Sequence, residues 1–229
     1  MRLSSPFKSL GLLVLLGVLT ACGGAYTPPA AAPEAGAAAT GLAYTNPTGT
    51  GWALVKDSSS TATRIVLNLV GPAGLKARGV GFNLGSDGSV RVHKFADGNY
   101  VKDLGVFQLK LSTPNLYTTN YPEFYEPTLM VGGVKQGGKL LTTGLFQKDR
   151  YQPAQDIAKP ICQIAIDFDA KTTGTLSPGA LIPLSLVRAR IIPEDIGTIP
   201  TGPHGDWTDV LVKFHMEDIQ IAVGSLRAQ

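Results

Sequence analysis

The side chains that could do chemistry in this sequence are three histidines, several acidic pairs and one interior cysteine. The histidines are His93, His204 and His215, and none of them forms the HxH or HExxH spacing of a metal site. His93 and His215 fall on the polar side of alternating strand patterns, and His204 lies in a Pro-His-Gly loop. The sequence therefore predicts solvated histidines and no histidine-based metal centre.

The acidic pairs offer a second kind of chemistry. Asp167 and Asp169 stand two residues apart at the end of an expected strand, so both carboxylates should point to one face. Such hard oxygen ligands could bind Ca²⁺, or they could simply keep the strand end solvated. Neighbouring acids also occur at Glu194-Asp195 and Glu217-Asp218. A glycosidase pair stays open, because catalytic carboxylates converge in space rather than in sequence.

Cys162 should lie on the same face of its expected strand as Ile164, Ile166 and Phe168. This pattern predicts a thiol that faces the core. A catalytic thiol would need an exposed, electropositive environment, and no histidine lies near Cys162 in the sequence. The chain also contains no GxSxG, P-loop or GxGxxG motif. We therefore expect a protein that is not an enzyme and that holds no cofactor.

The first residues have the parts of a secretory signal. Arg2 and Lys8 supply positive charge, and residues 10–19 form an apolar run that is too short to span a bilayer. The run ends in Leu-Thr-Ala-Cys at positions 19–22, which resembles the lipobox of bacterial lipoproteins. The resemblance implies that residues 1–21 are a signal peptide and that Cys22 carries the lipid that anchors the chain in a membrane.

Removing the signal also removes Arg2 and Lys8, so the formal net charge falls from +3 to +1. Gly23, rather than Asp, follows the cysteine, which by resemblance to enterobacterial sorting favours the outer membrane of the cell envelope. Residues 22–43 are rich in Ala, Pro and Gly, and we expect a lipidated tether there. One domain should then occupy residues 44–229.

That domain shows short apolar runs separated by Gly, Pro, Asn, Asp and Ser, which is typical of strands and turns. Apolar residues alternate with polar ones in most of these runs. The expected strands cover residues 52–55, 64–70, 79–84, 90–93, 107–111, 129–134, 139–146, 161–168 and 181–192. In residues 210–223 the apolar residues move from one face of the expected strand to the other near Glu217-Asp218. Such a change predicts a break where the chain crosses between sheets.

Roughly ten strands without helices predict an all-β fold, an antiparallel β-sandwich. Residues 63–84 place a strand, a Gly/Pro turn and a Gly-Val-Gly-Phe-Asn-Leu strand in succession, and Gly-Gly-Lys-Leu-Leu opens another strand at 137–141. This order resembles cohesin-like domains, which are jelly-roll sandwiches related in architecture to carbohydrate-binding modules. The resemblance implies a docking module.

An aromatic loop over residues 112–127 is the strongest candidate for contact with a partner. It carries Tyr117, Tyr121, Phe124 and Tyr125 among prolines, and Trp207 is a further candidate in another loop. Tyrosine is enriched at interfaces, but the simpler interpretation of such a loop is a long connection that caps one end of the sandwich. The near-neutral charge lacks the basic footprint of nucleic-acid binding.

The sequence favours the first of three functions, and the other two are alternatives. The first is a lipid-anchored binding or scaffolding module that contacts an envelope protein or polysaccharide. The second is a carbohydrate-binding module that uses the aromatic loop. The third is an envelope enzyme that acts on polysaccharide through carboxylates.

Overall fold

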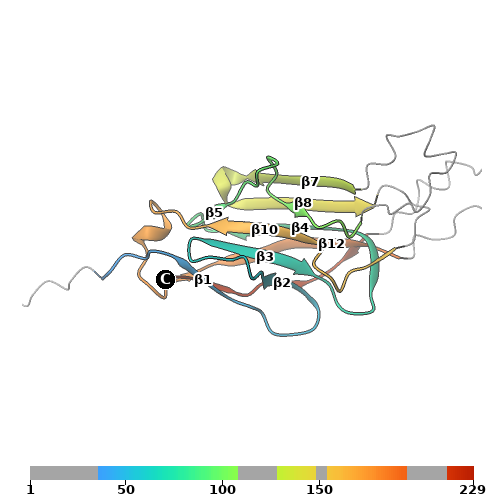
Figure 1. Cartoon of the computed structure of the whole chain (residues 1–229), viewed down its shortest axis with the longest axis horizontal. Helices are drawn as coiled ribbons and strands as arrows, with labels where there is room; N and C mark the ends of the chain where they lie inside the picture. The colour runs from blue at the N-terminus through green and yellow to red at the C-terminus, as the bar shows by residue number, and fades with distance from the viewer. Residues whose placement is uncertain (1–35, 108–127, 148–153, 195–215) are drawn as a thin grey trace, which may run out of the picture. The chain divides into compact units, whose positions relative to one another are not determined.

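A computed structural model describes residues 36–107, 128–147, 154–194 and 216–229 (Figure 1). The residues it describes form β-strands and two short 3-10 helices, η2 (Gln136–Gly138) and η3 (Thr173–Thr175), and no α-helix. The predicted all-β class is therefore confirmed. No helix in the described ranges is long and apolar enough to cross a membrane.

Sheet B contains the strand whose bounds the sequence predicted most closely. In β3, Ile65, Leu67 and Leu69 alternate along one face and are fully buried. The sheet holds, in pairing order, β14 (Ile221–Ala222), β2 (Trp52–Lys56), β3 (Arg64–Val70), β10 (Cys162–Asp167) and β5 (Arg91–Val92), with β6 (Lys102–Asp103) also paired to β10. Its pairs are antiparallel except for β14 with β2, which run parallel.

Sheet C forms the opposite layer and carries the Gly-Val-Gly-Phe-Asn-Leu segment in its central strand. The sheet holds, in pairing order, β13 (Glu217–Asp218), β12 (Leu184–Pro193), β4 (Lys76–Ser86), β8 (Leu140–Gln147) and β7 (Thr128–Lys135), with β9 (Gln155–Asp156) also paired to β4. Val80, Phe82 and Leu84 of β4 are buried, so Gly79 and Gly81 lie on the face directed away from the core.

The core lies between these two sheets, whose strands run roughly along one direction of the picture (Figure 1). Both sheets contribute to one cluster of buried apolar side chains, as the sandwich prediction requires. Phe107 is fully buried in this cluster but lies in a turn, whereas the sequence predicted that it begins a strand. The rest of that expected strand, residues 108–111, lies outside the described residues.

Sheet A joins the first described residues to the end of the chain. It pairs β1 (Leu42–Thr45) with β15 (Ser225–Ala228), which also pairs with β11 (Leu181–Ile182). The backbone N–H of Gly41 donates to the Gln229 carbonyl at 2.9 Å. Ala39 and Leu42 are buried, so the expected domain start at residue 44 is too late. The sequence pattern missed this because the apolar residues before residue 44 are few and stand among small ones.

The change of parity near the end of the chain does mark a crossing between sheets. Strand β13 pairs with β12 in sheet C, whereas β14 pairs with β2 in sheet B. The break falls between Asp218 and Ile221, just after the predicted Glu217-Asp218 position. Residues 195–215, which include the beginning of that expected strand, lie outside the described residues.

Tyr44 ties sheet A to sheet B through its hydroxyl. The Tyr44 Oη donates to the carbonyl of Leu54 at 2.9 Å and accepts the backbone N–H of Gly224 at 2.6 Å. Burial raises the pKa of Tyr44 above its ordinary value of 10.0, although the Gly224 hydrogen bond opposes this effect. The folded protein therefore holds this proton more tightly than the unfolded chain does.

Replacing Tyr44 with phenylalanine should lower the free energy of unfolding by about 1–2 kcal/mol at neutral pH, because a buried carbonyl and a partly buried N–H group lose their partner. A raised folded pKa stabilises the protein fully below pH 10, and this contribution disappears as the pH rises through the folded value. Urea unfolding between about pH 8 and pH 11 should show a steeper alkaline loss in the wild type than in Tyr44→Phe. Equal slopes in the two proteins would contradict this assignment.

Candidate functional site

Several residues singled out in the sequence lie outside the described residues. They are Cys22, Tyr117, Tyr121, Phe124, Tyr125, Asp195, His204, Trp207 and His215. Their proposed roles in anchoring and in partner contact therefore remain sequence-based predictions. The site described below is built from other residues.

The thiol of Cys162 faces the core, as its strand parity predicted. The residue is fully buried in β10, and burial raises the pKa of the thiol well above its usual range. A thiol that stays protonated and inaccessible cannot act as a nucleophile at neutral pH. Cys162 therefore serves as a small apolar core residue.

His93 is not the solvated histidine that its polar parity predicted. Its side chain is largely shielded, and its Nδ1 lies 2.8 Å from Oδ2 of Asp167. The ring also packs edge-on against Phe95, with the ring centroids 5.2 Å apart. The prediction was wrong because the partner of His93 lies 74 positions away in the sequence and only the pairing of β5 with β10 brings it close.

Asp167 and Asp169 are held by different arginines. Arg64 Nε lies 2.6 Å from Oδ1 of Asp167 across the β3–β10 pair. Asp169 is only 9% exposed; it forms an ion pair with Arg91 and accepts the backbone N–H of Lys171 at 2.9 Å. In the ranges that the structure describes, no group of three metal-ligating side chains forms. The carboxylates are thus neither simply solvated nor gathered into a Ca²⁺ site there.

Two further acidic residues, Glu194 and Asp218, also lie beside cations. Glu194 lies 3.8 Å from the Lys76 ammonium group, and Asp218 lies 2.7 Å from Arg190 Nε. These pairs are exposed and therefore contribute little to stability. The Arg190 hydrogen bond is the main reason that the pKa of Asp218 is lowered.

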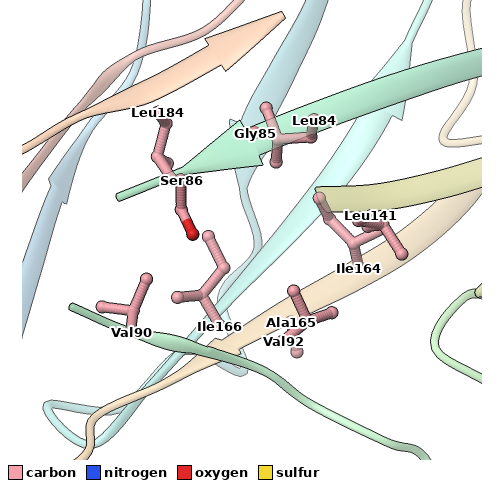
Figure 2. A pocket seen from close by; sticks show the side chains of 10 residues that line it. All are labelled: Leu84, Gly85, Ser86, Val90, Val92, Leu141, Ile164, Ala165, Ile166 and Leu184. Carbon is pink, nitrogen blue, oxygen red and sulfur yellow. The ribbon is translucent and has the colours of Figure 1, made fainter. Parts of the chain in front are cut away.

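A recess between the two large sheets is lined almost entirely by apolar side chains. Figure 2 shows Leu84, Leu141 and Leu184 of sheet C facing Val90 and Ile166 from the opposite layer. Its volume is about 10 Å³, close to the space that one water molecule needs. The recess is therefore a packing gap of the core rather than a ligand pocket.

A larger hollow lies on the outer face of sheet C, and we call it the outer hollow. Its volume is about 180 Å³, many times the space for one water. The described residues that define it come from β4, β8, β12 and the start of the last described segment. They include Gly81, Asn83, Phe146, Arg188, Arg190 and Met216. It combines an aromatic ring, an amide and two guanidinium groups in one place.

Three glycines determine where the aromatic ring of the outer hollow lies. Gly81 pairs with Gly144 and Gly79 pairs with Phe146 across β4 and β8. A Cβ atom built on Gly79 would lie 2.6 Å from Cδ1 of Phe146, and one on Gly144 would lie 2.8 Å from Cε2. The ring therefore occupies space that any larger residue at these positions would fill.

The cationic wall of the outer hollow comes from alternate residues of β12. Arg188 is opposite Asn83 and Arg190 is opposite Gly81 in the β12–β4 pair, so both arginines lie on the outer face. Arg190 is held by Asp218 at 2.7 Å, whereas Arg188 Nε lies 3.8 Å from the same carboxylate. Arg188 is thus the more loosely held of the two.

The alternation within residues 79–84 sets Gly79, Gly81 and Asn83 opposite the apolar face of the strand, but it does not reveal a hollow there. The alternation within β4 was visible, and so was the strand that contains Phe146. The register that sets Phe146 over the glycines, and the position of β12 on the other side of β4, were not visible. A glycine pair on the outward face of a strand was the one available signal.

No family model matches this chain, and a search of curated proteins found no match. Among solved structures, the chain is similar to a type II cohesin domain from the cellulosome of Acetivibrio cellulolyticus. The two share 11% sequence identity with a TM-score of 0.37, over 77% of this chain and 93% of that one. At this level the similarity concerns the backbone arrangement and assigns no site residue.

Proposed function

We propose that this chain is a lipid-anchored, non-enzymatic binding module of the bacterial cell envelope. The observation that carries the binding role is the outer hollow, where Phe146, Asn83, Arg188 and Arg190 surround one depression on an exposed sheet face. Pockets that bind ligands typically combine apolar surface with a few convergent polar groups. The rival polysaccharide-acting enzyme gains no support from Asp167 and Asp169, because arginines engage both carboxylates.

The anchoring part of the proposal rests on the Leu-Thr-Ala-Cys segment that ends at Cys22. Each buried methylene of an attached acyl chain contributes about 0.8 kcal/mol, so two or more chains hold a protein on a membrane stably. The tether after Cys22 would then lift the sandwich from the lipid surface. Gly23 favours the outer membrane by resemblance to lipoprotein sorting.

Labelled palmitate should enter the wild-type protein and should be absent from Cys22→Ser. Cys162→Ala is the matched control, because its thiol is buried in the core and the variant should label like the wild type. Membrane fractionation of the same cells should move Cys22→Ser to the soluble fraction. Equal labelling of the wild type and Cys22→Ser would refute the anchor.

The binding role is tested by a photo-crosslinking residue introduced at Asn83, which borders the outer hollow. Gln163 provides the control, because its neighbours Cys162 and Ile164 face the core and it therefore lies on the outer face of sheet B. We expect adducts with an envelope component from position 83 in living cells and none of the same adducts from position 163. Identical adducts from both positions, or none from position 83, would count against the proposal.

A further inference from the structure

Among the residues that the structure describes, the outer hollow carries more positive than negative charge. Two guanidinium groups, Arg188 and Arg190, share one carboxylate, that of Asp218. Glu217 precedes Asp218 in β13 and is paired with Ile191, whose side chain faces the core. Glu217 therefore lies on the opposite face of the strand from Asp218 and the two arginines. The Arg188 side chain is 56% exposed, so its planar fork of donors is open to a ligand. This arrangement is complementary to an anion, and best to a carboxylate.

The ring beside these charges is positioned to stack with a flat partner. The backbone at Gly79, Gly81 and Gly144 supports Phe146 from the sheet side, and the ring borders the hollow. An aromatic ring offers a broad apolar surface at little entropic cost. The amide of Asn83 on the same face can both donate and accept hydrogen bonds. The hollow thus presents an apolar surface, an amide and a cation together.

From this combination we propose that the outer hollow binds an acidic sugar of the uronic acid class. The apolar C–H face of the sugar ring would stack on Phe146, its carboxylate would pair with Arg188, and a hydroxyl would bond to Asn83. An acidic peptide side chain supplies the carboxylate but no rigid ring face with adjoining hydroxyls. A neutral sugar supplies the ring but brings no second carboxylate for the two guanidinium groups that share Asp218. The proposal names the ligand class for the binding module and rests on that proposed function.

The direct test is calorimetric titration of the full chain in detergent with three probes. Oligogalacturonate is the acidic sugar, a maltooligosaccharide of equal length is the neutral sugar, and polyglutamate is the acidic peptide. We expect binding of oligogalacturonate that weakens with added salt, because a charged pair at an exposed site is screened. We expect the other two probes to bind at least about tenfold more weakly, since each lacks one of the matched groups.

Two variants locate the interaction. Arg188→Gln should weaken oligogalacturonate binding by about tenfold or more, because a hydrogen bond between charged groups is lost. Phe146→Leu should weaken it as well, since the side chain stays apolar but loses the flat ring. Arg227→Gln is the matched control, because Arg227 is an exposed arginine of β15 in sheet A, away from the outer hollow. Circular dichroism confirms that each variant is folded.

Unchanged affinity in Arg188→Gln and Phe146→Leu would overturn the proposal, and so would absence of oligogalacturonate binding by the wild type. Polyglutamate binding that equals or exceeds oligogalacturonate binding would replace the sugar with an acidic protein partner. If the acidic sugar does not bind while position 83 still gives specific adducts in cells, the ligand class is wrong and the binding module stands. If the acidic sugar does not bind and position 83 gives no specific adducts, the binding role is refuted as well.

Discussion

Replacing Gly224 with alanine should lower the free energy of unfolding by about 3 kcal/mol or prevent folding altogether, because added volume in a tightly packed site is costly. A Cβ atom at this position would overlap the Thr45 carbonyl oxygen and would lie 2.7 Å from Cζ of Tyr44. The backbone of β1 cannot move away without breaking its pairing with β15. The Tyr44 hydrogen bonds to Leu54 and Gly224 would be lost in the same change.

Gly51→Ala is the matched control, because no heavy atom lies within 4 Å of a Cβ built there. This variant should stay within about 0.5 kcal/mol of the wild type or gain slightly from a less flexible unfolded chain. Urea unfolding followed by circular dichroism measures both. Gly224→Ala with wild-type stability would show that sheet A tolerates a shift that its contacts do not suggest.

Phe107→Ala should lower the free energy of unfolding by about 3–5 kcal/mol, the usual cost of removing a buried aromatic side chain. Phe107 is fully buried in the common core of the sandwich. For a chain of this size the melting temperature should fall by about 10 °C. The loss combines the apolar surface no longer buried with the cavity that remains.

Val131→Ala is the corresponding control on an edge strand, since Val131 of β7 is 55% exposed. We expect a change within about 0.5 kcal/mol there, as for other surface substitutions. Differential scanning calorimetry of the two variants separates core packing from strand propensity. A small effect of Phe107→Ala would mean that the core closes over the cavity.

The alternation of apolar and polar residues predicted much of the architecture. Strand β3 begins and ends at the predicted residues, and Val80, Phe82 and Leu84 of the predicted 79–84 strand face the core. The burial of Cys162 follows from the same pattern. These predictions succeeded because the period of a strand is local, so each segment records which of its faces is buried.

Contacts between distant segments were not predictable in the same way. Asp167 meets His93 and Arg64, which lie 74 and 103 positions away in the sequence. The short strands of sheet A and the domain start before Leu42 depend on pairing with the chain end. A two- to four-residue strand carries too few alternations to be recognised, so its partner defines it.

The sequence by itself determined the class of fold and most of the long strands, because burial imposes a repeating pattern on neighbouring residues. It also contains the apolar run and the Leu-Thr-Ala-Cys segment on which the proposed anchor rests. Only the tertiary structure decided the outer hollow, where the register of β4 with β8 and β12 brings Phe146, Asn83 and Arg188 together. Register depends on which strands meet across the sheet, and that choice is made by packing of the whole domain rather than by any one segment.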